Sequence, residues 1–319
     1  MMTFGPVSSR RLGKSLGINN IVSPKVCSYN CVYCQAGETS KLSSKRSEFY
    51  TPEVIYESVA RHLGQLSHDN YPDYLTFVSN GEPTLDKNLG KSIALLKSFQ
   101  IPVAVISNAF LLNHGKVRED LMQADWVSIK MDAGDSERWH YVNRPDQDLD
   151  FDIIIKGIMK FAQDYDGLLC TETMLIGGIN DTPDNFENLS RLISEINPHT
   201  AYLAIPTRPP SVVSVKPPDT EKLNLAWQIF NDRKIRTELL IGFEGISTGY
   251  TGNIYDDILN ITAVHPLRDD SMAELLKNDR ADKLVIDSLI DQGLIRSVLY
   301  NGHRYYMREY HFEKNSSRG

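Results

Sequence analysis

The chain has 319 residues, of which 41% are hydrophobic and 24% charged, and its formal net charge at pH 7 is −7. These values are those of an ordinary globular protein, and they leave room for one barrel of about 200–250 residues plus a small module. No signal-peptide pattern and no run of ~20 apolar residues occurs, which argues against a membrane partner and predicts a cytoplasmic protein. Four cysteines, three of them clustered, do not make a disulfide framework and suit a reducing compartment.

Positive charge is concentrated at the N-terminal end. Residues 1–46 hold seven basic side chains and one acidic side chain, Glu38, although the whole chain is acidic. The excess indicates either a site that attracts an anionic substrate or simply a solvated basic segment, and both interpretations stay open.

Strand and helix patterns alternate along most of the chain. The first strand is expected at 15–22, directly before the clustered cysteines. The other predicted strands lie at 74–78, 103–106, 126–131, 168–176 and 201–205, with one more at 237–241. The predicted helices lie at 51–66, 89–99, 116–122, 151–161, 185–196 and 220–230.

Six strand-helix units starting at residue 15 predict an α/β fold with a partial (β/α)6 TIM-like barrel over residues 1–245. Such a barrel is open on one side, which would admit a large substrate. A doubly wound open sheet is the alternative, because periodicity does not decide closure. In either fold, ligands collect at the C-terminal ends of the strands.

The rest of the chain predicts a linker and a small module. Residues 246–262 are expected to form a linker or lid, since glycines are frequent between 242 and 252. Residues 263–312 show two helix patterns and a hairpin that turns at Asn301-Gly302, so they resemble a winged-helix α+β module, and 313–319 read as a tail. Residues 254–319 contain nine basic and eleven acidic side chains, which argues against a reader of duplex DNA.

Cys27, Cys31 and Cys34 form a C-x₃-C-x₂-C motif. A structural zinc site needs four ligands, and the histidine closest in sequence is the distant His62. A four-iron cluster held by three thiolates instead keeps one iron open to another ligand. Cys27, Cys31 and Cys34 are therefore the predicted metal site, and the resemblance described next implies that they hold a single, site-differentiated [4Fe-4S] cluster. After these three, only Cys170 is left, which is too few thiols for a second cluster.

This motif, with Tyr33 just before the last cysteine, resembles the cluster loop of the radical S-adenosylmethionine (SAM) superfamily. The resemblance implies that the open iron binds SAM. An electron, from a donor such as flavodoxin or ferredoxin, then cleaves SAM to methionine and a 5′-deoxyadenosyl radical, which abstracts hydrogen from a substrate. The substrate class expected here is an RNA or a protein or peptide.

Looser motifs at the predicted strand ends follow the order of the superfamily. They resemble elements that contact the SAM ammonium, its carboxylate and ribose, and its adenine, although each is also compatible with ordinary turn chemistry. The first of them is Gly81-Glu82, where Asn80 stands in place of the first glycine of a Gly-Gly-Glu motif. The implied SAM-binding residues are Tyr33, Gly81, Glu82, Ser107, Asn108, Lys130, Asp132, Ile176 and Gly178.

The segment from Phe4 to Gln35 also resembles a bacterial and archaeal group related to wyosine synthases, with a C-terminal winged helix, and this implies tRNA modification. Arg208 is the predicted contact for a substrate carboxylate or phosphate, or else a structural ion pair. The alternative function is a metal-containing nucleic-acid-binding or redox-sensor protein that uses the winged helix. No catalytic acid-base pair is evident.

Overall fold

The computed structural model describes residues 2–22, 24–242 and 244–309. Within them, eight strands form one curved sheet in the order β1-β2-β5-β6-β7-β8-β9-β10. Strand β1 is antiparallel to β2, and all other neighbours in the sheet are parallel. The strands are β1 (Thr3–Ser9), β2 (Gly13–Ile18), β5 (Tyr74–Phe77), β6 (Val103–Ser107), β7 (Trp126–Lys130), β8 (Leu168–Met174), β9 (Thr200–Ala204) and β10 (Thr237–Leu240). The predicted α/β partial barrel is confirmed.

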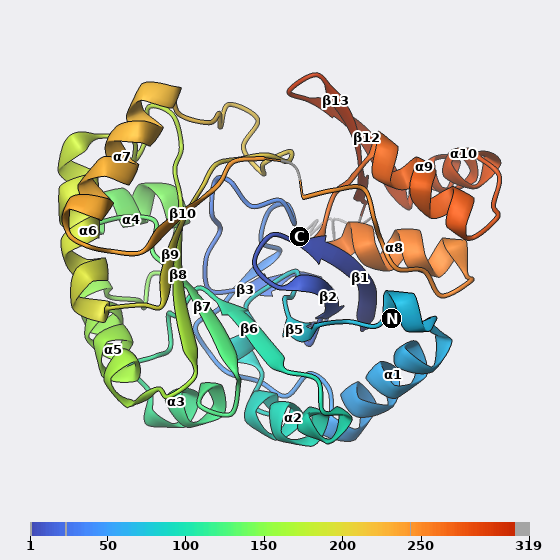
Figure 1. Ribbon diagram of the computed structural model, residues 1–319, viewed down its shortest axis with the longest axis horizontal. Coiled ribbons are helices and arrows are strands. Elements are labelled where there is room, and N and C mark those ends of the chain that lie inside the picture. Colours follow the sequence, from blue (N-terminus) through green and yellow to red (C-terminus); the bar gives the residue numbers. More distant parts are fainter. Residues whose placement is uncertain (1, 23, 243, 310–319) are drawn as a thin grey trace, which may run out of the picture.

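Helices cover the outer face of the sheet (Figure 1). They are α1 (Pro52–Gln65), α2 (Leu89–Leu96), α3 (Gly115–Leu121), α5 (Phe151–Asp164), α6 (Pro183–Ile196) and α7 (Thr220–Asp232). Their starts follow from side-chain caps: Thr51 accepts a hydrogen bond from Val54 N, and Asp150 accepts one from Ile153 N. The core between helices and sheet contains fully buried aromatic side chains such as Phe77, Phe161 and Phe186.

Three elements differ from the sequence expectations. Strand β1 was not predicted; it makes an antiparallel hairpin with β2, which spans 13–18 rather than 15–22. Helix α4 (Ser136–Asn143) was missed because it buries only Trp139, Val142 and the polar Asn143, so its apolar periodicity is weak. Helix α8 (Ile254–Val264) begins inside the expected linker at 246–262 and buries Ile258 and Ile261.

Residues 247–249 lie along β1, at the edge of the sheet opposite β10. Thr248 forms an antiparallel bridge with Val7, and Gly249 N donates to the carbonyl of Pro6. A Cβ atom at Gly249 would lie 2.3 Å from Pro6 Cδ, so this approach requires glycine. The glycine-rich segment therefore links the two edges of the curved sheet.

The C-terminal elements pack on one side of the barrel (Figure 1). They comprise α8, α9 (Asp269–Asn278) and α10 (Leu284–Asp291), with a described sheet in the order β11 (Leu267–Arg268), β13 (His303–Arg308) and β12 (Ile295–Tyr300). Asn301 and Gly302 have positive φ angles of 47° and 78°, as the predicted two-residue hairpin turn requires. The predicted tail at 313–319 lies outside the described residues.

Short elements complete the barrel. The paired strands β3 (Val26–Cys27) and β4 (Lys41–Leu42) flank the cysteine loop, and single 3-10 turns occupy His68–Asn70, Pro83–Leu85 and Lys97–Phe99. None of the helices in the described ranges is long and apolar enough to cross a membrane.

Candidate active site

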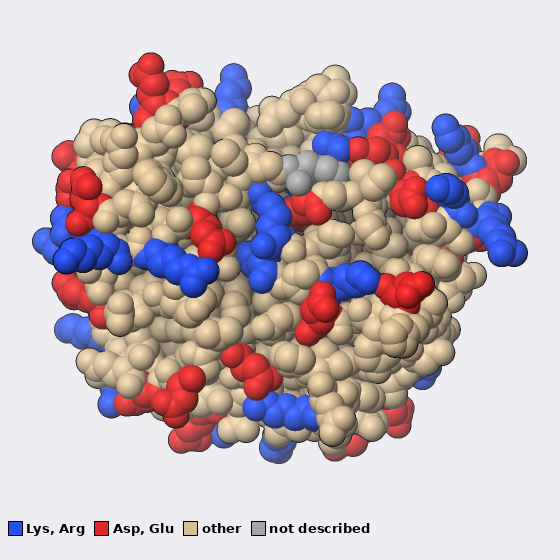
Figure 2. Space-filling view, in the orientation of Figure 1, with Lys and Arg blue, Asp and Glu red and all other residues tan. Residues whose placement is uncertain are grey.

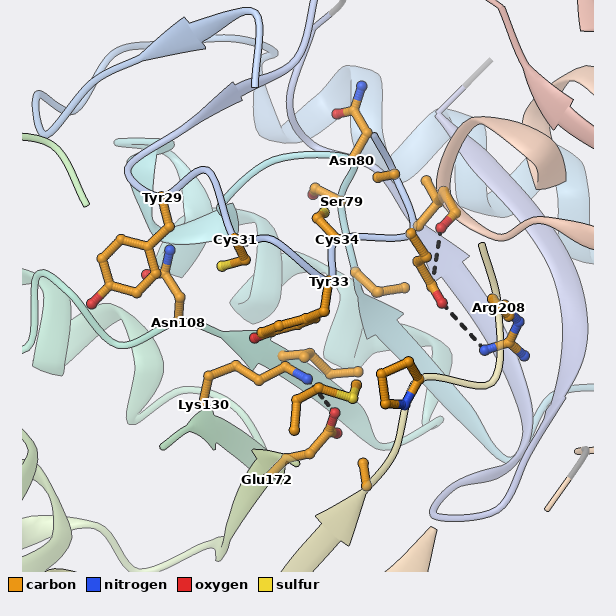
Figure 3. A pocket seen from close by; sticks show the side chains of 18 of the residues that line it. Tyr29, Cys31, Tyr33, Cys34, Ser79, Asn80, Asn108, Lys130, Glu172 and Arg208 are labelled. Atoms are coloured by element: carbon orange, nitrogen blue, oxygen red, sulfur yellow. Dashed lines mark hydrogen bonds and ion pairs between the residues drawn. The ribbon is translucent and has the colours of Figure 1, made fainter. Parts of the chain in front are cut away.

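A cavity of about 240 Å³ opens at the C-terminal ends of the parallel strands. Cys27, Cys31 and Cys34 all line it. Figure 3 shows Cys31, Cys34 and Tyr33 near the middle, with Asn108 on one side and Arg208 on the other. The loop after β2 thus brings the cysteines to the place where the sequence predicts a ligand.

Each of the three sulfurs has a nitrogen donor. Lys25 Nζ lies 3.0 Å from Cys34 Sγ, Asn143 Nδ2 lies 3.4 Å from Cys31 Sγ, and Asn108 Nδ2 lies 3.9 Å from Cys27 Sγ. Such donors stabilise negative charge on sulfur and tune a thiolate-bound cluster. The surroundings of the sulfurs therefore fit anionic ligands.

The protonation of the free thiols is set by burial and by Lys25. Burial raises the pKa of Cys27 to about 12 and raises the pKa of Cys31 further. Burial acts in the same sense on Cys34, but the charge and hydrogen bond of Lys25, together with the backbone N–H of Ala36 and the charge of Lys130, outweigh burial and lower the pKa of Cys34. Cys34 is thus closest to the thiolate form that binds a metal, whereas Cys27 and Cys31 would release their protons only when a metal binds.

The three cysteines do not form a binding site for a single metal ion among the described residues. In the described part of the chain, no three His, Cys, Asp or Glu side chains converge on one metal-ion position. Three thiolates would instead suit a four-iron cluster, which they would hold with one iron left open to another ligand.

Gly81 has a different close neighbour from the one expected. A Cβ atom there would lie 1.8 Å from the carbonyl oxygen of Val26, and Glu82 N donates to that oxygen at 3.3 Å. The sequence suggested that this glycine lets the backbone approach a ligand. In the structure it lets the loop after β5 pack against the backbone of the cysteine loop.

Glu82, Ser107 and Asn108 are brought together at the cavity. Glu82 is 2% exposed and accepts hydrogen bonds from Ser107 Oγ at 2.7 Å and from Asn108 N at 2.8 Å. It also accepts from Thr84 N at 3.0 Å and so caps the 3-10 turn at Pro83–Leu85. Burial raises the pKa of Glu82, and these hydrogen bonds oppose that shift. Glu82 therefore has both positions that the sequence suggested: it lines the cavity, where a ligand would bind, and it caps the turn that follows it.

Asn80, which replaces a glycine of the superfamily motif, lines the cavity beside Gly81. Its side chain is 2% exposed, yet neither its amide nitrogen nor its amide oxygen has a hydrogen-bond partner among the described residues. A buried amide without partners costs free energy, so Asn80 is suited to bind a ligand.

Tyr33 lines the cavity, whereas Asp132 lies behind it. The Tyr33 hydroxyl donates to Asp132, which also accepts from Asn143 Nδ2 at 2.7 Å and from Met174 N at 2.8 Å. Asp132 therefore holds Tyr33 and Asn143 in place and does not present a free oxygen to the cavity. Lys130 Nζ lies 5.8 Å from the centre of the Tyr33 ring.

Ile176 and Gly178 are not part of the cavity lining. Ile176 is fully buried in a small apolar cluster with Val32 and Val142. Gly178 has a φ of +73°, and its N–H donates to Asp181 at 2.9 Å. Met174, at the end of the same strand, lines the cavity instead.

The sequence reasoning missed a charged group on the cavity wall. Glu172, in β8, forms ion pairs with both Arg11 and Lys130 (Figure 3 shows the pair with Lys130). Burial lowers the pKa of Lys130 to about 8, against the opposing charge of Asp132. The available signal was an acidic residue in an otherwise uncharged strand, Leu168–Met174.

Arg208 lines the cavity and also forms an ion pair. Its partner is Glu244, which Arg10 also contacts at 3.2 Å. Gln35, the residue after Cys34, accepts a hydrogen bond from Arg208 Nη1 at 3.3 Å and donates one to the carbonyl of Val264 at 3.2 Å. Both readings made from the sequence for Arg208, ligand contact and ion pair, are compatible with this position.

Comparison with known proteins decides the family. The sequence profile of the Radical SAM superfamily matches residues 21–193, which is more than half of the chain. The protein belongs to the radical SAM superfamily. It is therefore an enzyme, and membership implies SAM and a [4Fe-4S] cluster as its cofactors.

One relative resembles this radical SAM protein over nearly its full length. A UPF0026 protein of Methanocaldococcus jannaschii is 43% identical over 309 residues, which covers 96% of each chain.

Two solved structures share the fold. A radical SAM methyltransferase from Sphaerobacter thermophilus aligns with a TM-score of 0.55 and 13% identity, covering 71% of this chain and 66% of that one. TYW1 with a bound lysine-pyruvate adduct aligns with a TM-score of 0.53 and 18% identity, covering 70% and 75%.

Proposed function

We propose that this radical SAM enzyme reductively cleaves SAM at a single, site-differentiated [4Fe-4S] cluster and uses the 5′-deoxyadenosyl radical to take hydrogen from a substrate. Cys27, Cys31 and Cys34 would hold the cluster, which when bound supplies the electron for cleavage. The observation that carries this proposal is that the three sulfurs share one cavity and each has a nitrogen donor.

SAM is proposed to lie on the Asn108 side of the cavity. Support comes from Tyr33, Gly81, Glu82, Ser107, Asn108 and Lys130, which line the same cavity as the cysteines. Asp132 would act through Tyr33, whose hydroxyl it holds. We retain Ile176 and Gly178 as proposed adenine contacts, which requires the adenine to extend past Met174 toward the loop after β8.

The substrate is proposed to be an RNA or a protein or peptide, with flavodoxin or ferredoxin as electron donor. We further propose that residues 1–245 form the barrel and 263–312 a winged-helix-like module. The module would shape the cavity, because Tyr305 Oη donates to the carbonyl of Thr207 at 2.9 Å, next to Arg208. Basic and acidic side chains are interspersed on the face in Figure 2, so this face offers no broad basic surface for nucleic acid.

The test is anaerobic reconstitution with iron and sulfide, followed by reaction with dithionite and SAM. We expect iron and acid-labile sulfide at about four per chain, and 5′-deoxyadenosine detected by mass spectrometry. Cys31→Ser should lose cluster and product together. Cys170→Ala is the matched control, because Cys170 is buried in a separate apolar cluster and should keep both. A colourless protein with zinc would contradict the proposal.

A second experiment addresses the substrate class. Mass spectrometry of tRNA and of the proteome, compared between cells with and without the gene, would show which molecule is modified. Binding of bulk tRNA that weakens steeply with salt would support RNA, and absence of such binding at low ionic strength would remove it.

A further inference from the structure

Two arginines from distant parts of the chain meet at one side of the cavity. Arg10 comes from the turn between β1 and β2, and Arg208 comes from the loop after β9. Glu244 lies between them, and its carboxylate forms an ion pair with each guanidinium group. The two side chains are only 22% and 11% exposed, so the pair is part of the cavity wall and not of the outer surface.

Charge is not balanced at this pair. One carboxylate serves two guanidinium groups, and the other close partner of Arg208 Nη2 is His265 Nε2 at 3.0 Å. Burial and the charge of Arg208 lower the pKa of His265 to about 3, so this ring is neutral at physiological pH. The Arg10–Arg208 pair can therefore accept one further negative charge.

Arg10 has hydrogen-bond donors that no described residue uses. Its Nη2 contacts Glu244 at 3.2 Å, whereas Nε and Nη1 are buried and lack a partner in the described chain. Buried, unpaired donors on a cation cost free energy, so an occupant that accepts their hydrogen bonds would stabilise the site. Guanidinium groups match carboxylates and phosphates, which accept such bonds in pairs.

The rest of the cavity supports an anion on this side. Arg11, next to Arg10, shares Glu172 with Lys130, so a second carboxylate also serves two cations. Among the described lining residues the other acid is Glu82, whose oxygens are occupied by Ser107, Asn108 and Thr84. Figure 3 shows Lys130 beside Asn108 and Arg208 on the opposite side of the cavity, so the excess positive charge of the Arg10–Arg208 pair lies away from Asn108.

We propose that Arg10 and Arg208 together bind an anionic group, a carboxylate or a phosphate, of the substrate. The assignment of this group to the substrate rests on the proposed function, in which SAM occupies the side of Asn108. The substrate is then an acid or a phosphorylated molecule. Its anionic group lies beside the cysteine loop, because Gln35, which follows Cys34, accepts a hydrogen bond from Arg208.

The test measures binding of two probes, inorganic phosphate and acetate, to the anaerobically reconstituted protein with saturating SAM. Ionic strength is kept constant with chloride, and binding is followed by titration calorimetry and by the shift in melting temperature. We expect saturable binding of at least one probe, weakened tenfold or more in Arg10→Gln and in Arg208→Gln. Preference for phosphate would indicate a phosphorylated substrate, and preference for acetate a carboxylic acid.

Controls separate local charge from general effects. Arg236→Gln removes an arginine that is 63% exposed and outside the cavity, and it should bind the probes like the wild type. Arg10→Lys keeps the positive charge but loses the planar set of donors, so it should bind the probes more tightly than Arg10→Gln and less tightly than the wild type. That order would show that Arg10→Gln weakens binding through loss of the charge at this position and not through misfolding.

Lack of saturable binding to the wild type, or equal binding to Arg10→Gln, would overturn the proposal. So would competition between the probes and SAM, because the arginines would then hold the SAM carboxylate. The readout is binding and not turnover. Failure to form 5′-deoxyadenosine would therefore refute the proposed reaction and leave the anion site intact. Failure to bind the probes would refute the anion site and leave the proposed reaction intact.

Discussion

The side-chain amide nitrogen of Asn143 lies 3.4 Å from the sulfur of Cys31. The same nitrogen lies 2.7 Å from an oxygen of Asp132, so the amide connects a proposed iron ligand to the acid that also holds Tyr33. Asn143 is 2% exposed and belongs to helix α4, which no sequence pattern indicated. This contact makes the electronic properties of the proposed cluster sensitive to α4.

Replacing Asn143 by alanine should make the cluster harder to reduce. The reduced cluster carries more negative charge and gains more from an N–H donor, so loss of the donor lowers the potential, by roughly tens of millivolts. Redox titration followed by electron paramagnetic resonance would measure this. Asn231→Ala, at an exposed position where the amide contacts Trp227, should leave the potential unchanged. An unchanged potential in Asn143→Ala would contradict the assigned contact.

Replacing Gly81 by alanine should disrupt the cysteine loop. The new methyl group would lie 1.8 Å from the carbonyl oxygen of Val26. Because this oxygen belongs to the backbone, relieving the clash requires the main chain to move. We expect the free energy of unfolding to fall by about 3 kcal/mol or more, with loss of bound iron. Gly64→Ala is the matched control, because a Cβ atom at that glycine in α1 would meet nothing within 4 Å beyond the backbone of its own helix, and the variant should gain about 0.5–1 kcal/mol of stability. Urea unfolding and iron analysis measure both effects.

Asn80→Ala should separate folding from ligand binding. Because the Asn80 amide has no partner in the described chain, its removal should leave the free energy of unfolding within about 1 kcal/mol of wild type. If the amide contacts SAM, the SAM dissociation constant should rise several-fold. Asn20→Ala provides the contrast, since that buried amide bonds to Pro83 and Asp86 and its loss should cost about 1–3 kcal/mol. Equal destabilisation by the two variants would count against the prediction.

Asp257 should make stability fall as pH rises. Burial, together with the nearby Asp279, raises the pKa of Asp257. The folded protein then binds a proton that the unfolded chain has already released above about pH 4, so stability declines from that pH toward the folded-state pKa. Asp257→Asn should remove most of this decline, roughly 1–3 kcal/mol. Urea unfolding at pH 5 and pH 8 tests it, with Asp291→Asn, at an exposed position, as a control that keeps the wild-type slope.

The sequence predicted the fold well where apolar periodicity was strong. The parallel strands β5 to β10 lie within a few residues of their predicted positions, because each is a short buried run between helices. Strand β1 was missed, since its burial depends on α8 and on residues 247–249, which are more than 200 residues away. Helix α8 was missed because the glycines before it read as the start of a longer linker.

The site was predictable only as far as local motifs reach. The cysteines, Glu82, Ser107 and Asn108 are short motifs at strand ends, and they do line one cavity. The pairs of Glu172 with Arg11 and of Glu244 with Arg10 join residues 161 and 234 positions apart, and no local pattern records such a meeting. Asp132 was predicted as an acid at the end of a strand, but the three groups that already use its oxygens were not predictable from any local motif.

Phe4, at the beginning of β1, is buried among side chains of the C-terminal elements, including Ile258, Ile261 and Leu275. During synthesis, the ribosome has to deliver almost the entire polypeptide before this aromatic ring finds its neighbours. The first strand, and the two arginines that follow it, are therefore completed last. Iron loaded earlier would enter a nascent protein in which Arg10 and Arg208 do not yet meet.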